Sequence, residues 1–235
     1  MPPSPKSDLK RLANPEKAKT LQRYFKTGKG DYGEGDIFIG LTSRQIKDVA
    51  KIHLNLTFKE IQALLGSKIH EERAYVLRIL VRQYEKAKKD PKKRKEISDF
   101  YLKNAALGNI NNWDLFDLSA PNIVGDFLLD KDRKPLYTLA KSEKLWGRRI
   151  SILSTLAFIR KGQFEDTLKI SEMLLNDRHD LIHKAVGWML REVGNRDKSA
   201  EVEFLDKFHK EMPRVMLRYA IEKMDKTKRE KYLRG

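Results

Sequence analysis

Apolar residues recur along most of this chain with the spacing of an α-helix. Between residues 69 and 87 they fall at Ala74, Leu77, Val81 and Tyr84, three or four residues apart, so they line one face of a helix. No stretch shows the strict alternation of apolar and polar residues that is typical of a half-buried strand. The pattern therefore predicts an all-α fold.

Local start signals place the helices more closely. Ser43 and Thr57 are suited to cap the helices that follow them, Pro91 suits a first helical position, and Ser119-Ala120-Pro121 opens a further helix. The predicted helices cover residues 8–27 with a break at Pro15, then 44–53, 58–65, 69–87, 92–107, 119–129, 133–141, 144–161, 163–175, 179–193, 198–211, 213–223 and 226–233. Residues 1–7 contain three prolines and are expected to form a disordered tail. Residues 8–235 are expected to form a single domain.

A repeat of basic residues runs through the predicted helices. Arg73, Arg149, Lys184 and Arg218 each lead into an apolar helix face, at spacings of 76, 35 and 34 residues, and the first spacing equals two steps of 38. Helix pairs that recur at such a period are typical of an α-solenoid of HEAT-like repeats. We therefore expect these four residues to form a basic ladder on one concave face. Chance periodicity in a helical chain is the alternative.

The step missing from this ladder falls at residue 111, where the sequence Asn111-Asn112-Trp113-Asp114-Leu115-Phe116-Asp117 begins. Two carboxylates and two aromatic rings lie within these seven residues. In one interpretation Trp113 and Phe116, three residues apart on a helix, pack in the core and leave both aspartates on the solvated side. In the other, Asp117 lies at the centre of the basic surface and has a chemical role, whereas Asp114 and Asp126 act as caps or ion-pair partners.

The composition of the chain indicates which class of molecule it binds. The 235 residues include 49 Lys and Arg against 33 Asp and Glu, a formal charge of +16. This excess predicts a polyanionic partner, nucleic acid first and an anionic membrane surface second. No apolar run reaches the roughly 18–20 residues that span a bilayer, and the N-terminus lacks the apolar stretch of a signal peptide. The sequence has no cysteine, which excludes disulfides, thiolate catalysis and zinc fingers. We expect a cytoplasmic protein, associated with the nucleoid if the source is prokaryotic.

Basic residues along one face suit the backbone of double-stranded DNA, which they would hold without reading sequence. A carboxylate on such a face repels phosphate. Asp117 is therefore either paired with Arg148 or Arg149, or catalytic. Cleavage of an N-glycosidic bond builds positive charge on the sugar, which a fixed carboxylate stabilises while it orients the attacking water. Trp113 and Trp188 are the candidate rings for cation–π contact with a cationic base or sugar.

Two weaker motifs are better explained by ordinary structure. Gly28, Gly30 and Gly33 match GxGxxG, but no strand precedes them, so they predict a flexible loop rather than a dinucleotide site. His179 and His183 are four residues apart without a third ligand or the glutamate of HExxH, so we expect surface histidines. We expect neither a metal nor a cofactor.

Four segments resemble those of the AlkD-like DNA alkylation repair glycosylases. They are NPEKAKTLQRYFK, NNWDLFDLSAPNIVGDFL, LWGRRISIL and IHKAVGWMLREVG, and the resemblance runs from about residue 14 to 222. It implies a HEAT-like fold and excision of cationic bases such as 3-methyladenine and 7-methylguanine from duplex DNA. By the same resemblance Asp117 matches the catalytic aspartate, Trp113, Trp188 and Tyr24 match aromatics of the lesion cleft, and Arg149 matches an arginine that holds the backbone.

Two hypotheses follow. The first is a monofunctional DNA-alkylpurine glycosylase, expected to be a monomer that acts on double-stranded DNA, with Asp117 as catalyst. Trp113, Trp188 and Tyr24 would contact the lesion and its sugar, and Arg149, Arg148, Lys184, Arg73 and Arg218 would bind the backbone. The second is a non-catalytic HEAT-like module that binds branched or damaged DNA, or an acidic protein.

Overall fold

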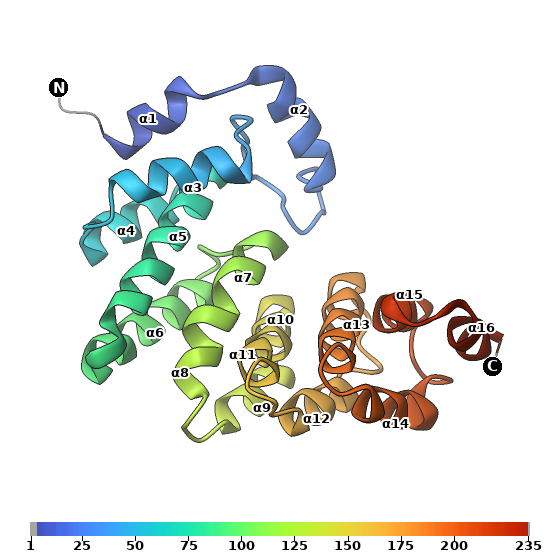
Figure 1. Ribbon diagram of the computed structural model, residues 1–235. Helices are drawn as coiled ribbons and strands as arrows, with labels where there is room; N and C mark the ends of the chain where they lie inside the picture. The colour runs from blue at the N-terminus through green and yellow to red at the C-terminus, as the bar shows by residue number, and fades with distance from the viewer. Residues whose placement is uncertain (1–3, 235) are drawn as a thin grey trace. The chain divides into compact units, whose positions relative to one another are not determined.

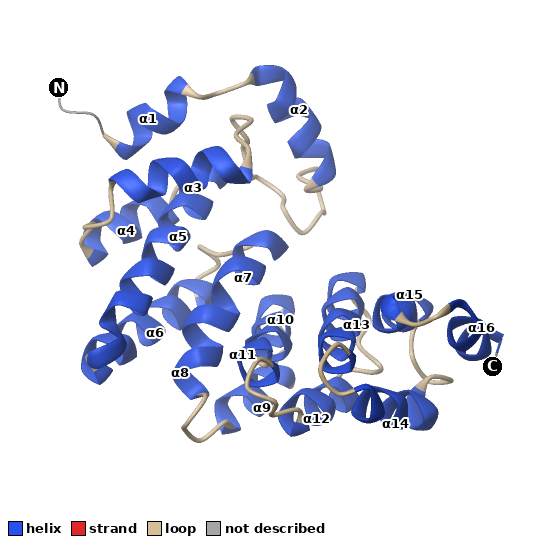
Figure 2. Cartoon of the chain, viewed as in Figure 1, coloured by secondary structure: helices blue, strands red, loops and turns tan. Residues whose placement is uncertain are grey.

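The computed structural model describes residues 4–234, and its regular elements are helices (Figure 2). Within these residues, β-type pairing is limited to an isolated bridge between Ile37 and Ile69. The all-α prediction is confirmed. Two compact units are present, Met1–Ser119 (unit 1) and Ala120–Gly235 (unit 2). The single domain expected over residues 8–235 stays a prediction.

Unit 1 is built around helix α5. Its helices are α1 (Pro5–Arg11), α2 (Pro15–Tyr24), α3 (Ser43–Ile52), α4 (Phe58–Leu65), α5 (His70–Lys86), α6 (Pro91–Ala106) and α7 (Trp113–Ala120), with a 3-10 turn η1 (Ala87–Lys89). Helices α1, α3, α4 and α6 pack against α5 (Figure 1). Leu77, Ile79 and Leu80 of α5 are fully buried among them. Because α5 is enclosed on several sides, side chains that point from it into the unit have fixed surroundings.

The start of α1 corrects one prediction. Ser4 and Ser7 form a reciprocal capping box, and Pro5 occupies the first helical position. Residues 5–7, expected to belong to a disordered tail, are therefore helical, and Leu9 behind them is fully buried. Residues 1–3 of that predicted tail lie outside the described residues.

The other caps of unit 1 agree with the sequence except at α3. There Thr42, and not Ser43, caps the helix, because Gln45 three residues later completes a capping box with Thr42. Thr57 caps α4, as predicted. Pro91 is the first residue of α6, also as predicted.

Unit 2 stacks its helices in order along the chain. They are η2 (Pro121–Gly125, a π-helix), α8 (Asp126–Leu128), α9 (Lys134–Ala140), α10 (Leu145–Ser154), α11 (Leu156–Ile159), α12 (Glu165–Met173), α13 (Asp180–Gly194), α14 (Lys198–Phe208), α15 (Arg214–Ala220), the 3-10 turn η3 (Ile221–Lys223) and α16 (Lys226–Arg234). Helix α13 lies between α10 and α15, with α12 and α14 also against it, and α9 packs on α10 (Figure 1). This is the stacking of helix pairs that an α-solenoid predicts.

The helix predicted to open at Ser119-Ala120-Pro121 does not begin there. Helix α7 already runs to Ala120, and the π-helix η2 and then α8 follow it. Proline has no N–H to give to a regular helix, and the wider turn of a π-helix is one way to accommodate that loss.

Candidate functional site

A cleft of about 540 Å³ opens in unit 1. Helix α5 lines it with His70, Ala74 and Arg78, which are four residues apart and therefore share one face. Helix α7 contributes Trp113, Asp114, Asp117 and Leu118. The remaining lining residues come from α2, from the loop before α3, and from α3 itself: Lys17, Leu21, Tyr24, Phe25, Phe38, Leu41, Thr42, Ser43, Ile46 and, from α5, Glu71.

Aromatic rings form one wall of this cleft. Phe25 is stacked on Trp113, with ring centroids 5.1 Å apart, and on Phe38, at 4.9 Å. Tyr24 meets Trp113 edge to face at 6.0 Å and is 64% exposed. The stack holds the Trp113 ring in place, and Tyr24 provides an open aromatic surface beside it for a flat or cationic ligand.

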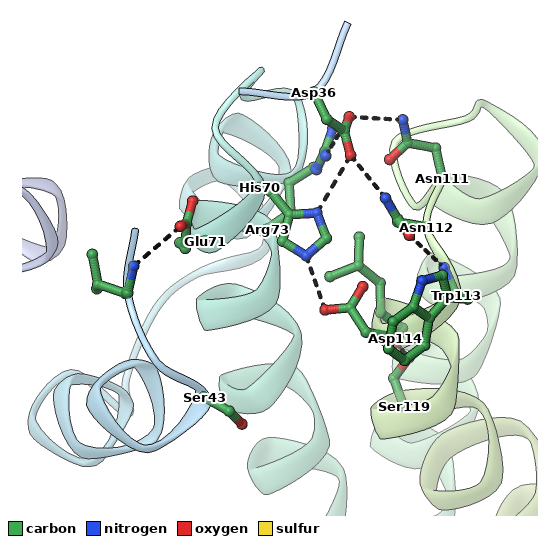
Figure 3. A network of polar contacts seen from close by, with 12 residues as sticks. Asp36, Ser43, His70, Glu71, Arg73, Asn111, Asn112, Trp113, Asp114 and Ser119 are labelled. Carbon is green, nitrogen blue, oxygen red and sulfur yellow. Dashed lines mark hydrogen bonds and ion pairs between the residues drawn. The ribbon is translucent and has the colours of Figure 1, made fainter. Parts of the chain in front are cut away.

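Side chains of opposite charge alternate in a network of ion pairs that ends in the cleft (Figure 3). Arg73 Nη2 lies 2.6 Å from Asp36 Oδ1, and Asp36 Oδ2 accepts from His70 Nδ1 at 3.3 Å. His70 Nε2 in turn donates to Asp114 Oδ2 at 2.9 Å. Asn111 and Asn112 also donate to Asp36. This network joins α5 and the start of α7, and it therefore fixes where the side chains of α7 lie.

His70 is protonated in this arrangement. Burial by itself would lower its pKa, but the charge of Asp114 and the hydrogen bonds to Asp114 and Asp36 outweigh burial and raise the pKa to about 9. For Asp36, burial opposes ionisation, whereas the bonds from His70 and Arg73 and the charge of Arg73 together hold its pKa well below the usual range. At neutral pH the imidazolium therefore compensates the charge of Asp114.

A buried carboxylate shapes the loop on the other side of the cleft. Glu71 accepts hydrogen bonds from the backbone N–H groups of Ile39, Gly40 and Leu41, at 2.8 to 3.2 Å. Gly40 has φ +86°, and a Cβ there would lie 2.0 Å from Asn14 O at the start of α2. Only glycine fits this position, so the loop can run close to α2 and place Phe38 and Leu41 in the cleft wall.

Three of the predicted site residues lie together in this cleft. Asp117, Trp113 and Tyr24 all line it, and Asp117 is half-buried one helical turn after Asp114. Asp114 pairs with His70, so its expectation as an ion-pair partner is confirmed. Phe116 is fully buried, and the half-buried Trp113 packs against the buried cluster of Ala18, Phe25 and Phe38. Core packing is therefore complete for Phe116 and partial for Trp113, whose ring also lines the cleft.

Arg73 corrects the predicted ladder. It is 5% exposed, and its guanidinium pairs with the buried Asp36. A charge enclosed in this way cannot serve as an exposed contact for DNA. The repeat spacing predicted a residue of α5, which does line the cleft, but the side chain of Arg73 points into unit 1.

The basic residues predicted in unit 2 lie on α10, α13 and α15, which pack side by side. Arg148 pairs with Asp177, and the 3%-exposed Arg149 donates to Leu181 O at 2.5 Å, so both brace α10 against the start of α13. Lys184 pairs with Asp180 on its own helix, and Arg218 is exposed. Arg149 is therefore wrong as a member of an exposed ladder. Trp188 is half-buried and donates its indole N–H to Glu192.

Sequence reasoning missed His70, Arg78 and Asp36. The recurrence of His70 and Arg78 on one face of α5 was available as a signal, because they are eight residues apart in a strongly helical stretch. Nothing local indicates Asp36, which lies in a loop and meets α5 only in the folded chain.

The two histidines weighed as metal ligands bond to backbone groups at or near the start of α13. His179 Nδ1 accepts from Leu181 N at the start of α13, and the His183 ring bonds to Asp177 O. Both are half-buried rather than fully at the surface. Between residues 4 and 234, no three His, Cys, Asp or Glu side chains are grouped so as to hold a metal ion. None of the helices described in the structure has the length and apolar character needed to cross a membrane.

Comparison with known proteins identifies the family. The sequence model of a family described as "DNA alkylation repair enzyme" matches residues 6–224. The chain belongs to this family. Among solved structures, one titled as a predicted DNA alkylation repair enzyme from Enterococcus faecalis is similar, with a TM-score of 0.69 and 16% sequence identity over 92% of this chain and 98% of that one. The likeness shows that the two share a fold. No curated protein sequence matches the chain.

Membership of this family implies an enzyme with a role in DNA alkylation repair, and therefore DNA as a partner. The cleft of unit 1 is the candidate site for that role, because it brings a carboxylate of α7 beside aromatic rings.

Proposed function

We propose that this protein is a monofunctional DNA glycosylase that hydrolyses the N-glycosidic bond of cationic alkylated purines, such as 3-methyladenine and 7-methylguanine, in double-stranded DNA. The observation that carries the proposal is the position of Asp117 in a cleft walled by Trp113 and Tyr24. Family membership supports a role in alkylation repair. The residues that line the cleft are the basis for proposing hydrolysis of the N-glycosidic bond as the reaction.

Asp117 would act as the catalytic carboxylate. An alkylated purine already carries positive charge and leaves readily, so the enzyme needs no general acid for the base. As the bond breaks, positive charge moves to the sugar, where the Asp117 carboxylate stabilises it and orients a water for attack. Trp113 and Tyr24 would contact the lesion and its sugar through their ring faces.

The charge compensation of Asp114 supports this assignment. With His70 protonated, the charge of Asp114 is countered within the protein. A sugar that gains positive charge in the cleft would then interact mainly with Asp117. Without the imidazolium, the charge of Asp114 would add to the repulsion of phosphates on an incoming strand.

The family motif also assigns roles in unit 2, which we propose in the same sense. Trp188 would be the second aromatic of the lesion site and Arg149 an arginine that supports the DNA backbone site. Lys184, Arg148 and Arg218 would contribute to backbone binding, with Arg218 the most accessible of the three. The protein would act as a monomer and require neither metal nor cofactor.

Release of base from a duplex that carries a single 7-methylguanine tests the proposal. Wild type should release the base well above the spontaneous rate, and Asp117→Asn should lower the rate by about 100-fold or more, the usual cost of removing a group that stabilises transition-state charge. DNA affinity should stay equal or increase, because the substitution removes a negative charge near phosphates.

Asp99→Asn is the matched control. Asp99 is an exposed carboxylate on α6 of the same unit, paired with Lys95 and outside the cleft, so base release should be unchanged. If wild type and the Asp117→Asn variant both bind the duplex but neither releases base, the protein is a non-catalytic DNA-binding module and Asp117 has a structural role.

A further inference from the structure

Helix α5 carries two arginines near the cleft that differ in their surroundings. Arg73 is enclosed and ion-paired with Asp36. Arg78, slightly more than one turn further along, lines the cleft itself, beside the residues of α7 that include Asp117. The sequence spacing had selected Arg73 for DNA binding, but the cleft contains Arg78.

The guanidinium of Arg78 has unused capacity to bind an anion. Its Nη2 donates to Ser43 Oγ at 2.6 Å, whereas its buried Nε has no hydrogen-bond partner. Arg78 forms no ion pair with any residue that the structure describes. The charge of Asp114 acts on Arg78, but Asp114 is already bonded to His70. A cation that is partly desolvated without a full set of partners gains free energy when an anionic oxygen reaches it.

We propose that Arg78 binds a backbone phosphate of the strand that enters the cleft, and so positions the adjacent sugar against Asp117. Only the second part of this proposal, the positioning of the sugar against Asp117, rests on the proposed function. The planar fork of arginine can hold two phosphate oxygens at once, which fixes both the distance and the direction of the strand. The hydrogen bond to Ser43 Oγ holds the guanidinium, so the fork is oriented before DNA arrives.

The arrangement of charges in the cleft fits a nucleotide better than an anion or a cation alone. Arg78 supplies a positive charge from α5, and Asp117 supplies a negative charge from α7. A sugar-phosphate unit in a glycosidic bond cleavage presents the complementary pair, a permanent negative phosphate and a sugar that becomes positive. Arg78 is thus a positioning residue, and the proposed chemistry at the sugar stays with Asp117.

The salt dependence of duplex binding tests this inference independently of catalysis. For undamaged duplex DNA, Arg78→Gln should lower the slope of log affinity against log salt concentration by about 0.9, the value for one lost phosphate contact, and weaken binding several-fold at low salt. Arg78→Lys should keep most of the slope, because it keeps the charge, but bind less tightly than wild type, because the fork is lost.

Arg82→Gln is the control variant. Arg82 lies on α5 one turn beyond Arg78, is half-buried and does not line the cleft, so its removal deletes the same charge from the same helix and should leave the slope unchanged. An Arg78→Gln slope equal to that of wild type, in a variant with the wild-type melting temperature, would overturn the proposal.

Neutralising single phosphates in the DNA provides a test that does not depend on how well Arg78→Gln folds. With a methylphosphonate at each position around the lesion in turn, one position should weaken binding of wild type about 10-fold. The same position should have a smaller effect on Arg78→Lys, which keeps the charge but lacks the fork. If no position couples to Arg78, the proposal fails. If coupling is found but wild type releases no base, phosphate binding by Arg78 stands and the glycosylase assignment fails.

Discussion

Among single residues, His70 is the cation that joins two carboxylates in the ion-pair network of unit 1. It lies between the carboxylates of Asp36 and Asp114 with 3% of its surface exposed. A buried imidazole between two carboxylates is stable only while it carries a proton, because its loss would leave two neighbouring negative charges with a single countercharge at Arg73. The stability of the protein therefore depends on pH above about 6.5, a range in which an ordinary histidine has already lost its proton.

We predict that the free energy of unfolding falls as pH rises from about 6.5 to 9. The pKa of His70 is about 9 in the folded protein and about 6.5 when unfolded, so its contribution is complete below pH 6.5 and is lost as pH passes 9. A shift of this size corresponds to about 3 kcal/mol. Urea unfolding at a series of pH values measures the effect.

His70→Gln should be less stable at neutral pH and lack this decline. A wild-type stability that stays flat between about pH 6.5 and 9.5 would contradict the prediction. His53, which pairs with Asp8 at 2.8 Å and is less buried than His70, offers a comparison, since His53→Gln should retain the decline.

Among the helices, close contacts between backbones fix the stacking of unit 2. Gly187 on α13 faces α15, where an added Cβ would lie 2.3 Å from Met216 O and 2.5 Å from Tyr219 Cβ. The neighbours are backbone and a Cβ rather than the flexible end of a side chain, so they can yield only if the helices separate. The glycine of the GWMLRE segment thus has a packing role, next to the Trp188 assigned to the lesion site.

Gly187→Ala should therefore destabilise the protein by about 1–3 kcal/mol, the usual cost of an overpacked core. Thermal or urea unfolding gives the measurement. Gly66→Ala is the matched control, because Gly66 has helical φ and ψ and a Cβ there would approach nothing closer than 3.6 Å. Equal stability of the two variants would show that α13 and α15 are not held at this distance in solution.

For the molecule as a whole, the affinity for DNA should depend on the net charge as well as on individual basic residues. The formal charge is +16, but two of the cations predicted to meet DNA, Arg73 and Arg149, are buried within the protein. Affinity for duplex DNA should then depend on a limited number of direct phosphate contacts in a generally positive field.

We expect duplex affinity to fall by about 100-fold between about 50 and 200 mM salt, which corresponds to about four phosphate contacts. Titration of a labelled duplex at several salt concentrations determines the slope. A nearly salt-independent affinity would exclude binding through the phosphate backbone.

The helices and the type of partner could be predicted from the amino-acid sequence. Helical periodicity, caps such as Thr57 and the proline at residue 91 depend on interactions within a few residues, so they can be read from the chain. Charge composition is likewise independent of folding. Asp117, Trp113 and Tyr24 were identified by a motif and a resemblance, and they do line one cleft.

Which charged residues face the cleft and which are enclosed became clear only in the folded protein. Arg73 and Arg78 lie on the same helix and look equivalent in sequence, yet Arg73 is buried against Asp36 while Arg78 lines the cleft. The difference arises because Asp36, from a loop, meets both Arg73 and His70, and His70 in turn meets Asp114 from a third segment. Burial and ion pairing of this kind depend on contacts between distant segments, and no local pattern encodes them.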